Sequence, residues 1–393
     1  ASFATQATFF DFDKDGDLDL FLMNHSLYPN SNYGKGALRD EVDHKSGDKL
    51  FENKQGEFED VTSQSGIFQG KIGYGLGLSI GDVTNDGYPD IYVGNDFFEN
   101  DYLYINQKDN TFKEVISKDK TVLGHTSHFS MGNAISDLNN DSKMDIISLD
   151  MLPENLKTYK TSGLEFPYQT YQYYLKNGYA PQFMQNTLHY NNGNETFTDV
   201  SDLLIDAGDI SGAGFIATWT DYDRDGDLDG YLLTNRIPPG EELKDVRFRL
   251  VKGPEGEPVI LPEEMQQYAG LIKSPSGYKQ IASGQFDRLY RNDGGKFVEV
   301  GKEAGVRESE YGLSATWWDY DADGWPDLYV ANDFYGADHL YRNKGDGTFE
   351  DVAPRALPHT PWFSMGSDVA DINNDGLFDY MASDMAGSDH YKE

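Results

Sequence analysis

One acidic pattern of nine residues occurs six times in the sequence. It reads DFDKDGDLD from Asp11, DVTNDGYPD from Asp82, DLNNDSKMD from Asp137, DYDRDGDLD from Asp221, DYDADGWPD from Asp319 and DINNDGLFD from Asp371. Every copy has oxygen-bearing side chains at positions one, three, five and nine, and Gly stands at position six in five copies. Oxygens at the odd positions of a tight loop can converge on one centre, and Gly at position six permits the sharp turn. Such an all-oxygen, carboxylate-rich site suits a hard cation.

Calcium fits this loop better than magnesium, because each copy offers five or more protein oxygens on flexible carboxylates. Position seven varies freely in residue type, so we expect it to contribute its backbone carbonyl. The pattern therefore predicts up to six bound calcium ions. The predicted metal residues are Asp11, Asp13, Asp15, Asp17, Asp19, Asp82, Thr84, Asp86, Tyr88, Asp90, Asp137, Asn139, Asp141, Lys143, Asp145, Asp221, Asp223, Asp225, Asp227, Asp229, Asp319, Asp321, Asp323, Trp325, Asp327, Asp371, Asn373, Asp375, Leu377 and Asp379.

Two other interpretations of the acidic pattern fit less well. An EF-hand would need Glu at position twelve and helices on both sides, whereas here position twelve is never Glu and apolar strand patterns follow. Solvated hairpin turns would explain one copy, but not six copies with oxygens at the same four positions. The Asp137 site is expected to be the weakest, because Ser142 replaces Gly. Thr84, a neutral ligand, should also weaken the Asp82 site.

A second motif alternates with the acidic loops, as in LFENKQGEFEDV from Leu50 and LYRNKGDGTFEDV from Leu340. Its apolar alternation around a Gly-rich turn predicts a β-hairpin. A run of small residues precedes each loop, and a period-two apolar run follows it. One unit is thus four short strands in about 50–55 residues, which is typical of a β-propeller blade. The sequence predicts an all-β propeller with six visible four-stranded blades, the last without its hairpin.

Two insertions interrupt the repeats, at about residues 152–185 and 236–285, in what we expect to be a single propeller domain over residues 1–393. A short helix is expected in YQTYQYYLKNGY and another at Pro262–Ala269. The first insertion is rich in Tyr, Phe and Lys, and aromatic anchors are what interfaces and sugar-stacking sites use. We predict that it recognises the partner. The alternative, that its rings pack on the propeller's own face, stays open.

Composition excludes several classes of protein. The 393 residues carry a formal charge of −35, which repels nucleic-acid phosphate and anionic membranes. Aromatic residues make up 14% of the chain, so it has the material for a core and is not expected to be disordered. There is no Cys, which excludes disulfides, thiol catalysis and Cys-bound zinc. No apolar run is long enough for a membrane helix. The chain starts without Met and is expected to be a piece of a longer protein.

The sequence contains little that points to catalysis. Gly77-Leu78-Ser79-Ile80-Gly81 matches a nucleophile elbow, but a metal loop follows it instead of a helix. We expect its glycines to permit close packing of inner strands. The eight His residues show no metal-binding spacing, and the equivalent positions of His125 and His359 favour a structural role. No catalytic residue is predicted.

The loops and LYxNxGxGxF hairpins resemble the FG-GAP/VCBS repeats of calcium-binding propellers such as those of integrin alpha chains. The runs HTSHFSMG and ATWWDYDADGWPDLYVANDFYGADHLYRNKGDGTFEDV are similar to bacterial surface proteins related to cartilage acidic protein, the ASPIC/UnbV-associated group. The resemblance implies an exported or surface-exposed propeller, often with seven blades. It leaves the blade count here at six or seven.

These observations favour a non-enzymatic, calcium-stabilised binding module at the cell surface. Its partner would be a protein or a glycan, and an accessory subunit of an outer-membrane complex is one form of this function. The location would be extracellular or at the outer-membrane surface. The alternative is a calcium-dependent polysaccharide lyase or hydrolase, and a purely structural scaffold is the third option.

Overall fold

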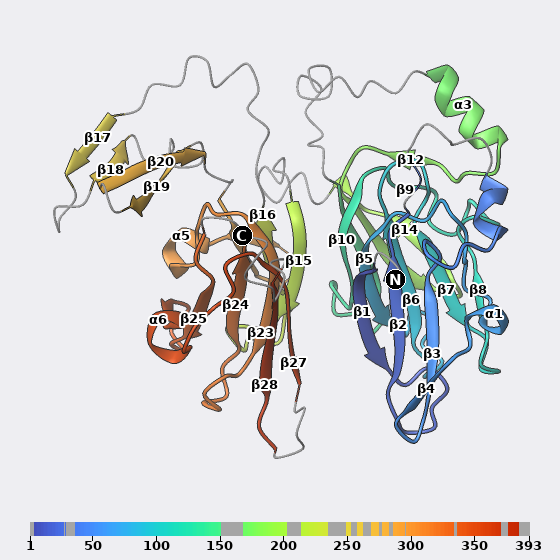
Figure 1. Cartoon of the computed structure of the whole chain (residues 1–393), viewed down its shortest axis with the longest axis horizontal. Coiled ribbons are helices and arrows are strands. Elements are labelled where there is room, and N and C mark those ends of the chain that lie inside the picture. Colours follow the sequence, from blue (N-terminus) through green and yellow to red (C-terminus); the bar gives the residue numbers. More distant parts are fainter. Residues whose placement is uncertain are drawn as a thin grey trace, which may run out of the picture. The chain divides into compact units, whose positions relative to one another are not determined.

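The computed structural model describes residues 4–26, 28, 36–150, 168–202, 214–234, 249–252, 258–261, 269–274, 277–282, 286–294, 296–333, 336–370 and 376–384. The chain divides into two compact units, Ala1–Ser211 and Gly212–Glu393, which are described one at a time (Figure 1). The single domain expected over residues 1–393 stays a prediction.

The first unit contains three antiparallel sheets of four strands each, and in each sheet the strands lie side by side in the order of the sequence. Blade 1 consists of β1 (Ala4–Phe10), β2 (Asp19–Asn24), β3 (Lys49–Lys54) and β4 (Glu57–Asp60). Blade 2 consists of β5 (Gly75–Gly81), β6 (Asp90–Asn95), β7 (Tyr102–Asn106) and β8 (Phe112–Glu114). Blade 3 consists of β10 (Ser130–Ser136), β11 (Asp145–Asp150), β13 (Thr187–Gly193) and β14 (Thr196–Asp199).

The second unit repeats this arrangement. Blade 4 consists of β15 (Gly214–Thr220), β16 (Asp229–Thr234), β21 (Arg288–Asn292) and β22 (Phe297–Glu299). Blade 5 consists of β23 (Gly312–Trp318), β24 (Asp327–Asn332), β25 (His339–Asn343) and β26 (Phe349–Asp351). A last sheet has two strands, β27 (Ser364–Ala370) and β28 (Asp379–Asp384).

The predicted order of strand, acidic loop, strand and hairpin is confirmed, and with it the all-β fold of propeller blades. Four-stranded sheets are found for five of the six predicted blades within the described residues. The sixth is the two-stranded sheet β27–β28, in line with its missing hairpin. A count of six or seven complete blades is not confirmed.

The Gly-rich first strands of neighbouring blades pack closely. A Cβ atom on Gly77 of β5 would lie 2.5 Å from the backbone oxygen of Met131 in β10, and one on Gly81 would lie 2.5 Å from the side chain of Ile135. The hydroxyl of Ser79 donates to the backbone oxygen of Asn133 at 2.9 Å. These contacts confirm the packing role of the glycines and place Ser79 inside a blade interface.

Apolar side chains fill the space between blades. Between blades 1 and 2 the core contains Phe12, Phe21, Leu50 and Tyr104, and position two of the first acidic loop supplies Phe12, which is 1% exposed. Tyr222 holds the same position in the Asp221 loop and is buried between blades 4 and 5. Four of the five described loops bury the apolar residue at position two, and Tyr320 of the fifth is partly buried, which anchors these loops to the core.

Short helices follow the outer strands or lie in the connections. They are η2 (Gly36–Asp40), α1 (Thr62–Ser65), α3 (Tyr168–Lys176), α5 (Gly301–Ala304) and α6 (Ala353–Ala356). None of the helices in the described part of the chain is long and apolar enough to cross a membrane.

The described parts of the insertions have their own elements. The helix predicted in YQTYQYYLKNGY is confirmed as α3, and β12 (Gln182–Phe183) then pairs in parallel with β9 (Thr126–Ser127). The second insertion forms two hairpins, β17 (Arg249–Lys252) with β18 (Pro258–Leu261) and β19 (Ala269–Ser274) with β20 (Gly277–Ala282). The helix predicted at Pro262–Ala269 falls on residues 262–268, outside the described residues, and Ala269 begins β19.

In several blades a buried carboxylate accepts hydrogen bonds from residues of the second strand. Asp101 accepts hydrogen bonds from the Tyr92 hydroxyl at 2.6 Å and from the N–H of Asn95 at 2.9 Å. Asp287 accepts the equivalent bonds from Tyr231 and Thr234. Burial raises the pKa of both carboxyls from 3.8 to about 7.

These two carboxyls make the stability of the fold depend on pH. Because their pKa is higher in the folded chain, their contribution is complete below about pH 4 and is lost as the pH rises through 7. We expect the Tm in EDTA to fall between pH 5 and pH 8, and Asp101→Asn or Asp287→Asn to reduce that fall. A loss of about 1 kcal/mol corresponds to roughly 2–4 °C.

Thermal melts at the two pH values, followed by circular dichroism, measure this effect. The control is Asp109→Asn on an exposed turn, which should leave the pH dependence unchanged. An identical fall in wild type and in both buried variants would contradict the role given to these carboxyls.

Candidate metal sites

Each acidic loop connects the first strand of its blade to the second. The loops at Asp11, Asp82, Asp137, Asp221 and Asp319 lie between β1 and β2, β5 and β6, β10 and β11, β15 and β16, and β23 and β24. In the sixth loop, the predicted ligands Asp371, Asn373 and Asp375 lie outside the described residues. Of that loop, Leu377 is exposed and Asp379 begins β28.

Carboxylates inside each loop turn toward the loop's own backbone. In the fourth loop, Asp221 accepts the N–H of Gly226 at 3.1 Å and Asp223 accepts that of Asp225 at 3.3 Å. Asp225 in turn accepts the N–H of Asp227 at 3.0 Å. The equivalent bonds recur in the other described loops. This folding of the loop on itself gathers the side-chain oxygens of positions one, three and five.

Three loops bring carboxylate oxygens within 4.8 Å of one another. The groups are Asp11, Asp13 and Asp15; Asp221, Asp223 and Asp225; and Asp319, Asp321 and Asp327. In the Asp82 and Asp137 loops, position three is Thr84 or Asn139, so these loops offer fewer carboxylates. The ranking of the loops by cation affinity stays a prediction.

Some oxygens in the richest loops are buried without a hydrogen bond. Among the described residues, Asp11 Oδ1, Asp17 Oδ1 and Asp221 Oδ1 are buried and have no hydrogen-bond partner. A buried acceptor without a partner costs about 1–3 kcal/mol. A bound cation would satisfy these atoms and offset the repulsion between neighbouring carboxylates, so the residues fit a hard divalent ion.

Positive side chains contact the carboxylates of three other loops. Lys108 Nζ lies 3.0 Å from Asp86, and Lys143 Nζ lies 2.6 Å from Asp141. Arg342 contacts two carboxylates of the Asp319 loop, at 2.6 and 3.1 Å. A metal ion in these loops would compete with, or displace, a side chain that already carries positive charge.

The carboxylate at position nine ties its loop to the hairpin. Asp327 accepts the N–H of Tyr320, at position two of its loop, at 3.0 Å and the N–H of Asn343, in the hairpin, at 2.7 Å. The same two bonds are made by Asp19, Asp90, Asp145 and Asp229. Burial raises the pKa of Asp327 to about 6 and that of Asp90 to about 7. Position nine therefore has a structural function, and its role as a ligand stays a prediction.

Position four, which the sequence presents as unconstrained, has a fixed backbone conformation. Lys14, Asn85, Asn140, Arg224 and Ala322 all have φ between 56° and 65°. Side-chain type varies because the requirement is on the backbone. Position six also has positive φ, and Ser142, at 66°, is the copy in which a residue other than Gly adopts it.

Positions four and seven of successive loops form pairs that the sequence analysis missed. Lys14 Nζ lies 5.6 Å from the centre of the Tyr88 ring, and the Arg224 guanidinium lies 4.8 Å from that of Trp325. In each pair a cation at position four meets an aromatic ring at position seven of the next loop. Such contacts contribute about 0.5–1 kcal/mol at exposed sites. Matching residue types in adjacent copies is the signal that could have revealed them.

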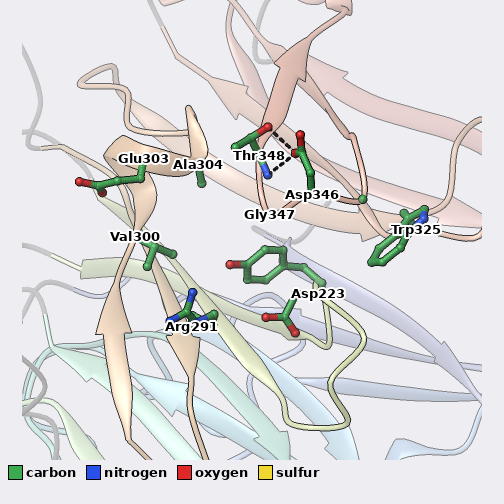
Figure 2. A pocket seen from close by; sticks show the side chains of 11 residues that line it. Asp223, Arg291, Val300, Glu303, Ala304, Trp325, Asp346, Gly347 and Thr348 are labelled. Carbon is green, nitrogen blue, oxygen red and sulfur yellow. Dashed lines mark hydrogen bonds between the residues drawn. The ribbon is translucent and has the colours of Figure 1, made fainter.

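A pocket of about 520 Å³ lies beside the Asp221 loop and is lined by Tyr222, Asp223, Arg291, Trp325, Asp346 and Thr348, among others (Figure 2). Asp346 accepts hydrogen bonds from the N–H and hydroxyl of Thr348. Arg291 pairs with Asp293 at 2.8 Å, which raises its pKa. Burial raises the pKa of Tyr222 to about 12. Arg291 and Tyr222 both keep their protons at neutral pH and are therefore not suited to act as a general base.

A second group of potential ligands was not expected from sequence. His125, His189 and Asp199 bring one ligand atom each within 4.8 Å of the others. Sequence spacing showed no His pair, because these residues come from three separate segments of blade 3 and its flank. The sequence feature that could have pointed to this group is His189, because the other hairpins have Phe51, Tyr104, Tyr290 and Tyr341 at its position.

Comparison with known proteins identifies the repeats. The model of the FG-GAP-like repeat family matches residues 11–93, 82–148 and 319–382, which together cover just over half of the chain. No curated protein matches the chain.

Among solved structures, 146 chains match. One is an Agrocybe aegerita lectin that recognises non-reducing terminal N-acetylglucosamine, with 13% identity and a TM-score of 0.34 over 86% of this chain and 82% of that one. Another is the V. cholerae biofilm matrix protein Bap1, with 8% identity and a TM-score of 0.34 over 96% and 84%. At this level of similarity, neither protein bears on what this chain binds.

The backbone of the third loop predicts a stabilising substitution. Ser142→Gly removes a side chain from a residue with positive φ, so we expect the free energy of unfolding to rise by about 1 kcal/mol. The cation affinity of this loop should rise with it. Thermal melts and calcium titration measure both effects.

The matched control is the reverse change, Gly87→Ser, at position six of the second loop. A Cβ there would meet only the end of the Lys14 side chain, at 4.0 Å, so its effect reports backbone strain. It should destabilise by a similar amount. A destabilising Ser142→Gly would show that the serine side chain has a function of its own.

Proposed function

This chain belongs to the FG-GAP-like repeat family, and we propose that it is a calcium-stabilised binding module for a protein or glycan partner outside the cell. The observation that carries the proposal is the set of buried carboxylate oxygens without partners, Asp11 Oδ1 and Asp221 Oδ1, inside loops already folded around them. An accessory subunit at the outer-membrane surface is the form of this function that the proposal favours.

Calcium is the proposed ion because the donor set is entirely oxygen. Positions one, three and five supply carboxylates in the Asp11 and Asp221 loops, position seven would add a backbone carbonyl, and position nine would add an oxygen from Asp19 or Asp229. The bound ion supplies positive charge where the chain concentrates negative charge. Up to six ions would be held in this way, the Asp137 loop most weakly.

The described part of the first insertion is anchored by one set of residues. Tyr174 stacks on Phe98 with ring centres 4.6 Å apart, and Tyr179 is fully buried. Arg39 forms a buried ion pair with Glu99 at 2.6 Å and donates to the backbone oxygen of Gly178 at 3.2 Å. The interpretation in which the rings pack on the chain itself thus holds for Tyr174 and Tyr179.

Another set of rings from the same insertion points to solvent. Tyr168 is 74% exposed, Tyr173 49% and Phe183 46%. Tyr168 and Tyr173 lie on the helix α3 and Phe183 lies on the strand β12, and large aromatic rings held on such anchored elements can contact a partner at low entropic cost. We therefore propose these three residues, the exposed rings, as part of the recognition surface.

The alternative of a calcium-dependent lyase or hydrolase has no specific observation in its favour. It needs a side chain that accepts a proton beside a groove. In the pocket of Figure 2, Arg291 pairs with Asp293 and the phenol of Tyr222 keeps its proton at neutral pH, and the carboxylate beside them, Asp223, is a predicted calcium ligand. The binding module is the better supported function.

Removing calcium should destabilise the fold. A site at a hundredfold excess of ligand over its Kd contributes about 2.7 kcal/mol, and several sites are linked through the blades. We expect EDTA to lower the Tm by many degrees and calcium to restore it, with magnesium at the same concentration as the control ion. Stepwise chelation should empty the Asp137 loop before the Asp11 loop.

Calcium content by mass spectrometry and differential scanning calorimetry measure these outcomes together. An unchanged melting curve once metal is shown to be absent would refute calcium as a folding ligand. Loss from the Asp11 loop first would refute the ranking by carboxylate number.

Recognition by the exposed rings is tested after a partner has been identified by pull-down from native membranes and by glycan arrays. Tyr168→Ala with Tyr173→Ala should weaken binding at least tenfold, at unchanged Tm, because hot-spot aromatics contribute more than about 1 kcal/mol each. Tyr179→Ala is the matched control, since it removes an anchoring ring and should lower the Tm. Binding that survives the loss of both exposed rings would move recognition elsewhere.

A further inference from the structure

Three side chains of blade 3 and its flank converge at one point. His125 lies just before β9, His189 lies in β13, and Asp199 ends β14. The Nε2 atom of His125 is 2.8 Å from Oδ2 of Asp199, and the two imidazole rings are 5.5 Å apart between centres. Their potential ligand atoms all lie within 4.8 Å of one another.

Both imidazoles are buried with unsatisfied nitrogen atoms. His189 is 0% exposed, and neither of its ring nitrogens has a full hydrogen bond among the described residues. His125 is 8% exposed, and its Nδ1 also lacks a partner. Burial lowers the pKa of His189 to about 4, so this ring is in the neutral form that binds metals.

The carboxylate is also held in position. Asp199 Oδ1 accepts hydrogen bonds from the N–H of Ser201 at 3.0 Å and from its hydroxyl at 2.6 Å. Partial burial acts to raise its pKa, but the bonds from Ser201 and His125 lower it to about 2. Oδ2 therefore stays an anionic donor that points toward the histidines.

Donor chemistry distinguishes this group from the acidic loops. Two imidazoles and one carboxylate suit zinc and similar transition metals, whereas the loops offer only oxygen. Zinc bonds of about 2.0–2.1 Å place tetrahedral ligand atoms roughly 3.4 Å apart. Here His125 Nε2 and Asp199 Oδ2 are 2.8 Å apart, and all three ligand atoms lie within 4.8 Å of one another, a range that includes this separation.

Blade 5 contains a histidine in a different environment, which serves as a comparison. There, His339 lies 3.0 Å from Asp351 and 3.4 Å from Glu310, so one imidazole stands between two carboxylates. Burial lowers the pKa of His339, but these carboxylates raise it to about 10. That cluster is an ion pair with a charged histidine, unlike the pair of buried imidazoles in blade 3.

We propose that His125, His189 and Asp199 bind one divalent transition-metal ion of the zinc class. Asp199, with a side chain 42% exposed, lies on the open side, where a fourth ligand such as water can bind. Phe183 of β12 covers His125, with ring centres 4.7 Å apart. Because β12 pairs with β9, the ion would connect blade 3 to the part of the insertion that carries an exposed ring.

The test uses the full chain, stripped of metal and then saturated with calcium so that the acidic loops are occupied. Zinc is titrated by calorimetry, and cobalt is titrated by visible absorption, which reports imidazole coordination of low symmetry. The variant His189→Tyr removes the imidazole and introduces the residue that blades 2, 4 and 5 have at this position. His359→Gln, at the exposed repeat counterpart of His125, is the control.

We expect one equivalent of zinc in the wild type and in His359→Gln, with a rise in Tm, and at least a 100-fold loss of affinity in His189→Tyr. If His189→Tyr does not fold, His125→Gln and Asp199→Asn decide the question in the same way. Zinc binding of equal affinity in wild type and in the ligand variants, or no binding in the wild type, would overturn the proposal. Neither result decides whether the acidic loops bind calcium, so the two proposals can fail separately.

Discussion

The fold depends on one buried carboxylate per blade, the aspartate at position nine of the acidic loop. Asp327 holds the backbone of Tyr320 and of Asn343, and the Asn343 side chain donates to the backbone oxygens of Pro326 and of Tyr222 in the preceding blade. Asn106 and Asn191 make the same bonds to the blades before them. One Asp–Asn pair thus joins a loop, a hairpin and a neighbouring blade, which explains why each hairpin has Asn at this point.

The Asp–Asn pair also helps to explain how a loop so rich in carboxylates keeps its conformation. Backbone N–H groups satisfy one oxygen of most carboxylates, as at Asp221 and Asp225, and the loop closes around the remaining oxygens. Those oxygens are what a cation would contact. The loops are not equivalent, because Lys143 and Arg342 bring positive charge to two of them, whereas the Asp11 loop keeps a buried oxygen without a partner.

Blade 3 differs from the other blades in several features that lie close together. Its hairpin has His189 in place of an aromatic residue, and its flank supplies His125 and the strand β9, which pairs with the inserted strand β12. The proposed zinc ligands, the covering ring of Phe183 and the anchored helix α3 therefore lie in one region of the first unit. A repeat that bears an insertion is where a repeat fold commonly acquires a specific function.

The sequence by itself determined the blade pattern, the acidic loops, the hairpins and the helix α3, because these features depend on neighbours within about ten residues. The turn residues, the two-residue alternation of apolar side chains and the six repeated copies were enough to predict them. Tertiary structure alone decided which rings of the insertion are buried, such as Tyr179, and which are exposed, such as Tyr168. It also brought together His125, His189 and Asp199, and paired Arg224 with Trp325. These contacts join residues up to about a hundred positions apart, and side-chain spacing along the chain does not encode which distant strands become neighbours.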